Sequence, residues 1–181
     1  IAVNKTGNEI VQGDKTGDTP LSEVVKLYIK EKYKKPGDVF IGVPHRLDRP
    51  TSGVVLFART SKALTRLNKM FQEKDLMKKT YWAVVDKKPP HSEATLHHWI
   101  VRNTKQNKSY AYTSNKPESK EAFLNLKLKS SSDNYHLLEI ELLTGRHHQI
   151  RAQLAAIGCI IKGDLKYGSR RSNPDGGIHL H

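Results

Sequence analysis

The chain has very little cysteine: Cys159 is the only one among 181 residues, so no disulfide framework is possible. Its neighbours are apolar, and a buried free thiol suits a reducing compartment, which predicts a cytoplasmic location. No apolar run reaches the roughly 18 residues of a membrane-spanning helix, and no signal peptide is visible. Because the chain begins at Ile1 without a methionine, we expect that a short N-terminal segment is missing.

Signatures of several common chemistries are also lacking. Four histidines form the adjacent pairs His97-His98 and His147-His148, which cannot aim both rings at one ion from a regular element, and no cysteine cluster accompanies them. We therefore predict no metal site. No Rossmann or P-loop pattern for a cofactor occurs, nor a helix-turn-helix or zinc pattern for DNA. His45 and Asp48 could also suggest a hydrolase dyad, but no Ser or Cys nucleophile in an elbow motif accompanies them.

Acidic residues are scarce: 18 Asp and Glu stand against 31 Lys and Arg, giving a net charge of +13. A surplus of this size indicates a polyanionic partner, with nucleic acid as the first candidate. A basic protein that is merely soluble is the alternative on charge alone. Charge alone does not decide between these two interpretations.

The length predicts a single domain over residues 1–181, with no repeat and no second-domain boundary. Apolar spacing predicts helices at about 20–35, at 62–73 with Ser61 as N-cap, and at about 146–157. Alternation predicts strands at 1–3, 9–12, 39–43, 53–58, 81–85, 121–129 and 135–143, and a hairpin within 94–113. This order predicts an α+β fold with a mixed, largely antiparallel central sheet flanked by helices.

The most informative stretch is residues 45–59, which read HRLDRPTSGVVLFAR. Pro50 and Gly53 place the polar cluster on a loop just before a strand. Asp48 then lies between two arginines, Arg46 and Arg49, on a loop backed by regular structure, which is how a reactive group is presented at a cleft. The alternative is an ordinary surface ion pair.

Two further stretches carry candidate residues. In LTGRHHQIRAQLAAIG, residues 143–158, a Thr-Gly turn leads into a helix on which Arg151 lies beside the apolar stripe. A partly buried Arg needs a carboxylate, for which Asp48 is the candidate, whereas an Arg that snorkels at the surface needs none. In KKTYWAVV, residues 78–85, alternation puts Tyr81, Ala83 and Val85 on one strand face, where Tyr81 could be a simple core aromatic.

These stretches resemble, in order and spacing, the HRLD-x-x-TSG, K-x-Y-x-A and TGR-x-HQIR motifs of RluA-type RNA pseudouridine synthases. GDLKYG at 163–168 resembles a fourth motif, GD-x-x-YG. Three features depart from the family: VNKTG at 3–7 stands where a Lys-Pro-x-Gly turn is usual, His147 replaces a Thr, and no S4-like RNA-binding domain accompanies the catalytic motifs. The last departure leaves substrate selection open.

The resemblance implies the pseudouridine synthase catalytic fold and the conversion of uridine to pseudouridine in structured ribosomal or transfer RNA. It implies that Asp48 is the nucleophile, Arg151 its charge partner and Tyr81 the ring against the flipped uracil. The reaction is redox-neutral, so no cofactor is expected, and we expect a monomer. The motif residues expected to bind substrate are His45, Arg46, Thr51, Ser52, Gly53, Arg146, His148 and Gln149.

Lysine-rich surfaces at 26–35 and 102–120 are expected to contact phosphates. Two alternatives stay open. One is a catalytically inactive RNA-binding domain, which would need only basic and stacking residues. The other is a DNA-binding protein, because net charge does not distinguish polyanions.

Overall fold

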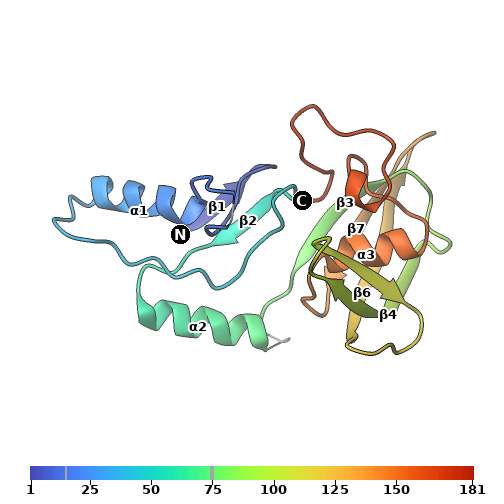
Figure 1. The fold of residues 1–181 in the computed structure, drawn as a ribbon, viewed down its shortest axis with the longest axis horizontal. Coiled ribbons are helices and arrows are strands. Elements are labelled where there is room, and N and C mark those ends of the chain that lie inside the picture. The colour runs from blue at the N-terminus through green and yellow to red at the C-terminus, as the bar shows by residue number, and fades with distance from the viewer. Residues whose placement is uncertain (15, 74–75) are drawn as a thin grey trace. The chain divides into compact units, whose positions relative to one another are not determined.

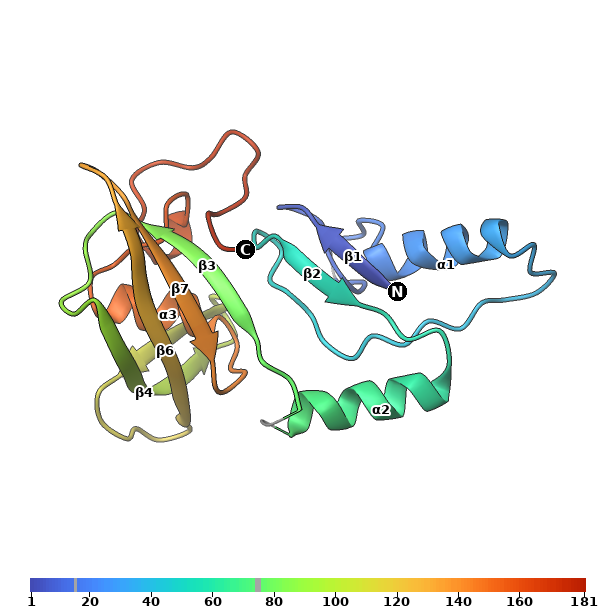
Figure 2. The same cartoon turned by 180° about the vertical axis from the view of Figure 1, so that it is seen from behind.

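The computed structural model describes residues 1–14, 16–73 and 76–181. The chain forms two compact units, Ile1–Met77 and Lys78–His181 (Figures 1 and 2). Each unit has its own apolar core. The sequence contains no composition shift or linker at this boundary. That residues 1–181 act as one catalytic domain stays a prediction.

The first unit pairs two short strands and adds two helices. Its elements are β1 (Ala2–Lys5), α1 (Leu21–Lys32), β2 (Gly53–Leu56) and α2 (Ser61–Gln72). The strands are antiparallel, with Ala2 opposite Leu56 and Lys5 opposite Gly53. Leu21, Val25 and Ile29 are spaced four residues apart, so they lie on one face of α1, and all three are buried. The buried core of this unit consists of Val11, Leu21, Val25, Ile29, Val55 and Phe57.

Two strands predicted in this unit are wrong. Residues 9–12 form no strand, because the carbonyl groups of Ile10 and Val11 instead accept the backbone N–H groups of Leu21 and Ser22, at 2.8 and 3.2 Å. The first turn of a helix leaves such N–H groups without intrahelical partners, and α1 has no side-chain cap. Residues 39–43 make only an isolated bridge, between Gly42 and residue 58.

The second helix is close to its prediction, with a different cap. Thr60, and not Ser61, is the N-cap of α2, and its Oγ1 accepts the N–H of Ala63 at 3.1 Å. A Cβ added at Gly42 would lie 2.8 Å from a methyl carbon of Leu64, so the glycine lets this segment approach the helix closely.

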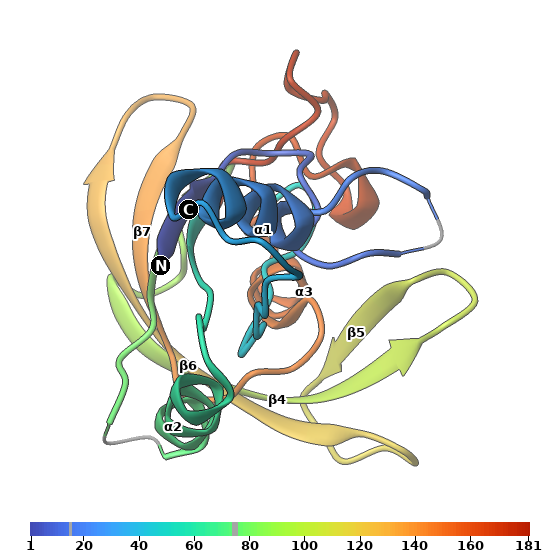
Figure 3. The same cartoon turned by 90° about the vertical axis from the view of Figure 1, so that its left-hand side faces the viewer.

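The second unit is a five-stranded sheet with a helix on one face. Its strands are β3 (Thr80–Val85), β4 (Glu93–Asn103), β5 (Lys108–Tyr112), β6 (Lys120–Ser131) and β7 (His136–Leu142). They lie in the order β3-β7-β6-β4-β5, and every neighbouring pair is antiparallel. The sheet curves around α3 (Gln149–Ala156), as Figure 3 shows. A short 3₁₀ helix, η1 (Leu165–Tyr167), follows.

The core of this unit lies between the sheet and α3. Its buried residues are Ala83, Val85, Leu124, Leu126, Leu138, Ile140, Ile150, Leu154, Cys159, Ile161, Ile178 and Leu180. The C-terminal segment completes one edge, because the backbone of His181 exchanges hydrogen bonds with that of Trp82, at 2.8 and 2.9 Å. The predicted α+β class and the hairpin within 94–113 are therefore confirmed.

The helix α3 begins at Gln149, three residues later than predicted. The residues before it form a turn, and His148 has a left-handed backbone with φ of 52°. That conformation is uncommon for a residue other than glycine and often marks a functional position. Of the helices described, none has the length and apolar character needed to cross a membrane.

Candidate active site

In the first unit, Asp48 lies on the predicted loop before β2. The N–H of Thr51 donates to the Asp48 carbonyl at 3.0 Å and closes a turn over the Arg49-Pro50 pair. The Asp48 side chain is half-buried. The loop therefore holds this carboxylate in a defined place at the end of a strand.

A fully buried lysine, Lys5 at the end of β1, holds the backbone of the Asp48 loop in place. Its Nζ donates three hydrogen bonds to carbonyl oxygens, at 2.8 Å to Thr6, 2.9 Å to Arg49 and 2.6 Å to Thr51. Two of these acceptors belong to the turn that carries Asp48. All three ammonium protons are thus used to fix the loop backbone.

Burial lowers the pKa of Lys5 from 10.5 to about 8, while the carboxylates of Glu9 and Asp48 act in the opposite direction. At neutral pH the ammonium therefore stays charged. The charge of Lys5 interacts with the Asp48 carboxylate, which is one of the two carboxylates that oppose the lowering of the Lys5 pKa.

Of the other residues of this motif, His45 and Arg49 have side-chain partners within the first unit, whereas Arg46 is exposed. His45 Nε2 accepts the N–H of Leu56 at 2.9 Å, and its ring stacks on Phe71 with centroids 4.4 Å apart, so it fastens the loop to β2 and α2. Arg49 forms an ion pair with Asp18.

The end of the motif enters the strand. The Thr51 hydroxyl is buried and has no hydrogen-bond partner among the described residues. Ser52 is half-buried, and Gly53 has φ of 137°, a region that favours glycine. A buried hydroxyl without a partner is costly, so Thr51 is suited to accept a ligand group.

In the second unit, Arg151 makes a two-pronged ion pair with Asp164. Nε donates to Oδ2 at 2.7 Å and Nη2 donates to Oδ1 at 2.8 Å. Both side chains are almost completely buried, with 4% and 1% of their surface exposed. The sequence predicted that this guanidinium lies at the edge of the core and needs a carboxylate, but it did not identify Asp164 as a partner.

A third interaction orients the same guanidinium. Arg151 Nη1 donates to His148 Nε2 at 3.2 Å, so this ring nitrogen must carry the lone pair. The proton of the neutral ring is then on Nδ1, which donates to the Tyr167 hydroxyl at 3.1 Å. The tautomer of His148 thus follows from its two neighbours.

The network ends at the backbone of β5. The Tyr167 hydroxyl accepts the N–H of Ser109 at 2.9 Å and donates to the Ser109 carbonyl at 3.1 Å. The Tyr167 ring also lies 5.0 Å from the guanidinium carbon of Arg151. Burial, and then the charge of Arg151, lower the pKa of His148 to about 2. The imidazole is therefore neutral at any physiological pH and serves as an acceptor.

Gln149 organises the turn before α3. Its Oε1 accepts the Thr144 hydroxyl at 2.8 Å and the Arg146 N–H at 3.0 Å, and its Nε2 donates to Phe123 O at 3.0 Å and Gln153 Oε1 at 2.9 Å. These four bonds support a positioning role for Gln149. The Arg146 side chain is exposed, with Nε donating to a backbone carbonyl of β6.

Tyr81 lies on β3, half-buried against the core of the second unit. As the alternation predicted, it shares a face with Ala83 and Val85, both fully buried, while Trp82 on the opposite face is 53% exposed. That shared face is the one covered by α3, which carries Arg151. The predicted pairing of Asp48 with Arg151 joins the two units and stays a prediction.

The sequence alone did not identify three residues of the candidate site, which are Lys5, Asp164 and Tyr167. Each lies in a motif that the sequence did single out, VNKTG at 3–7 and GDLKYG at 163–168. Motif position was therefore the available signal. Among the described residues, no three His, Cys, Asp or Glu side chains are grouped as a metal site would require.

Comparison with known proteins identifies the family. The family model described as RNA pseudouridylate synthase matches residues 1–156. The chain therefore belongs to this family, of RluA type. The match includes Asp48, Tyr81 and Arg151, whereas Asp164 and Tyr167 lie beyond it.

Two relatives and two solved structures are similar to this chain. An uncharacterized RNA pseudouridine synthase of Chloroflexus aurantiacus is 37% identical over 80% of this chain and 42% of its own length. Ribosomal large subunit pseudouridine synthase C of Rickettsia conorii is 34% identical over 96% of this chain and 55% of its own. The chain thus spans about half the length of these relatives.

The structures are human RNA Pseudouridylate Synthase Domain Containing 4 and 1. The first has a TM-score of 0.81 at 22% identity and covers 99% of this chain and 77% of the human one. The second has a TM-score of 0.68 at 24% identity and covers 96% and 75%. These likenesses establish the pseudouridine synthase fold.

Proposed function

We propose that the chain converts uridine to pseudouridine in structured RNA. The observation that carries the proposal is the family match over residues 1–156, which contains all three proposed catalytic residues. In this reaction the N1–C1′ bond breaks, the uracil turns, and C5 bonds to C1′. C5 loses a proton and N1 gains one, so the product is an isomer and no redox cofactor is required.

Asp48 is the proposed nucleophile, which attacks C1′ or assists the departure of uracil. Either role needs an ionised carboxylate in a site from which water is excluded. The three carbonyl contacts of the Lys5 ammonium support a fixed position for the loop. Positioning of this kind contributes a large share of enzymatic rate.

Arg151 is the proposed charge partner of Asp48. The Asp164 ion pair and the neutral His148 ring hold three of its N–H groups in fixed directions. The surrounding network supports an arginine held rigidly enough to orient a carboxylate.

Tyr81 is proposed to stack on the uracil and to help remove the C5 proton. A uridine in a stem must flip out of the helix to reach such a ring. Arg46 is proposed to occupy the vacated space, which its exposure supports. Thr51, Ser52, Arg146 and His148 complete the proposed substrate contacts.

The RNA is proposed to be ribosomal or transfer RNA. The name of the Rickettsia conorii relative refers to the large ribosomal subunit, which makes the RNA of that subunit the first candidate. We further propose a monomeric, cytoplasmic enzyme.

The test is to map pseudouridine in total RNA from cells with and without this gene, and to restore the gene as wild type or as Asp48→Asn. We expect one or a few sites to disappear with the gene and to return only with wild type. Asp38→Asn, at an exposed carboxylate, is the matched control and should restore them. Identical maps with and without the gene would favour the inactive RNA-binding alternative.

A further inference from the structure

The outer face of the β4–β5 hairpin, away from α3, carries exposed aromatic side chains. Trp99 on β4 pairs directly with Tyr112 on β5, and Tyr110 lies two residues away on the same face. The two tyrosines are 36% and 38% exposed. Their neighbour Ser109 points the other way and is fully buried.

The aromatic row continues across the sheet onto β6. The ring of His97 stacks on Phe123 with centroids 4.3 Å apart and planes 13° apart, and it lies 6.0 Å from the ring of Trp99. The aromatic platform is defined here as these five side chains: His97, Trp99, Tyr110, Tyr112 and Phe123. A continuous row on the open face contributes nothing to the core between the sheet and α3.

Lysines accompany the tyrosines. Lys108 Nζ lies 5.4 Å from the ring centroid of Tyr110, and Lys116 Nζ lies 6.0 Å from that of Tyr112. Residues 102–120 contain five basic side chains and one acidic one. Aromatic rings interleaved with cations are suited to single-stranded nucleic acid, whose bases stack while its phosphates pair with the charges.

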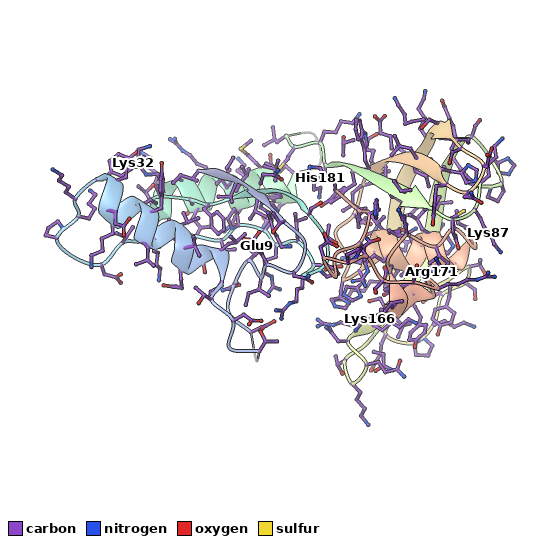
Figure 4. All side chains as sticks on the ribbon, turned by 90° about the horizontal axis from the view of Figure 1, so that it is seen from above. Glu9, Lys32, Lys87, Lys166, Arg171 and His181 are labelled. Atoms are coloured by element: carbon purple, nitrogen blue, oxygen red, sulfur yellow. The ribbon has the colours of Figure 1, made fainter. Side chains whose placement is uncertain are left out.

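The hairpin is held in place and adjoins the candidate site. Lys166 of η1, labelled in Figure 4, donates to the carbonyl groups of Gln106 and Asn107 at the hairpin tip, both at 3.2 Å. Lys108 Nζ lies 5.0 Å from the ring of Tyr167, the same ring that contacts Arg151. One lysine thus links the platform to the network around Arg151.

Farther from the hairpin tip, the sheet carries acidic side chains that are paired with lysines. A shallow groove there is lined by Glu93, Glu139 and Glu141. Each forms an ion pair with a lysine, Glu93 with Lys127 at 2.6 Å, Glu139 with Lys129 at 3.6 Å and Glu141 with Lys78 at 3.3 Å, so the charges of these three lysines are compensated. Glu121 pairs with His97 at 3.2 Å at one end of the platform, so the charge pattern favours a polyanion at the other end, beside Lys108 and Lys116, and disfavours one along the groove.

We propose that the aromatic platform binds an unpaired stretch of the substrate RNA that flanks the structured element. Bases stack on Tyr110 and Tyr112, and Lys108 and Lys116 pair with the phosphates. Paired bases could not use these rings, because their faces are already stacked within the helix. The proposal rests on the proposed function for its RNA substrate.

The test measures affinity for an RNA hairpin with and without a single-stranded extension, at fixed salt. Tyr110→Leu/Tyr112→Leu should bind the extended RNA at least about 30-fold more weakly, since two stacked bases together contribute roughly 2–6 kcal/mol. Affinity for the RNA without the extension should not change. Tyr110→Phe/Tyr112→Phe keeps both rings and should bind as wild type, which separates stacking from misfolding.

Tyr135→Leu is the matched control, because Tyr135 is 40% exposed and has Lys162 Nζ 4.9 Å from its ring but lies outside the platform. Equal affinity of the leucine double variant and wild type for the extended RNA would overturn the proposal, as would a change confined to oligomeric state. If no RNA is pseudouridylated but the tyrosine-dependent preference persists, the proposed function fails and the platform stands.

Discussion

Arg151 and Asp164 form a buried, two-pronged ion pair at 2.7 and 2.8 Å, in which both side chains are shielded from water. Such a pair fixes the plane of the guanidinium, because each oxygen is matched to one N–H group. It also means that the charge of Arg151 is compensated within its own unit. A role toward Asp48 would then be one of orientation more than of neutralisation.

Replacing Arg151 with Met should abolish pseudouridine formation and lower the free energy of unfolding by about 3–5 kcal/mol, because the buried Asp164 carboxylate loses its partner. Urea unfolding and a tritium-release assay would measure the two effects. The double variant Arg151→Met/Asp164→Leu removes both charges and should recover stability without activity. An active Arg151→Met protein would contradict the assignment.

Replacing Lys5 with Met should lower both activity and the free energy of unfolding. Three carbonyl groups lose their donor, and an unsatisfied buried group costs about 1–3 kcal/mol. The turn that carries Asp48 should then become mobile, so the catalytic rate should fall more than the affinity for RNA. A variant with wild-type rate and stability would show that the loop needs no anchor. Lys30→Met, at an exposed lysine of α1, is the control.

His148 should make the protein sensitive to acid. Its pKa is lowered to about 2 in the folded chain, whereas an unfolded histidine titrates near 6.5, so below about pH 6.5 only the unfolded chain takes up the proton. The stabilisation is complete above about pH 6.5 and is lost as the pH falls. Between pH 7 and 5 the loss should be about 2 kcal/mol.

His148→Asn removes this titration and tolerates the left-handed backbone, so its unfolding free energy should depend less on pH in this range. His91→Asn, at an exposed histidine, should keep the wild-type slope. Equal slopes for His148→Asn and wild type would indicate that other groups cause the acid sensitivity.

The sequence was most reliable where periodicity repeats over several residues. The alternation at Tyr81, Ala83 and Val85 predicted which face of β3 is buried, and apolar spacing predicted the helix that the structure shows as α1. Short apolar runs were less reliable. Ile10 and Val11 are buried as their character suggests, but their carbonyl groups serve the start of a helix, which no local pattern reveals.

For the site, the motifs located the residues but not their partners. Asp164 lies 13 positions after Arg151, beyond the end of α3, so no spacing rule joins them. Lys5 is a buried charge in a sequence full of exposed lysines, and only the fold distinguishes it. Pairings between distant segments depend on the packing of the whole unit, which is why they escape sequence analysis.

Tyr81→Phe separates stacking from proton transfer. The variant keeps the ring, so affinity for RNA should persist, since base–aromatic stacking contributes about 1–3 kcal/mol. If the hydroxyl helps to remove the C5 proton, the overall rate should fall by about 10²–10⁴-fold, as for the loss of a general base. We expect the phenylalanine protein to bind RNA, to cleave the glycosidic bond and to stall before C5 deprotonation. A single-turnover assay with C5-tritiated RNA would record this as lost tritium release. Release at the wild-type rate would mean that Tyr81 only stacks, and that water or Asp48 is the base.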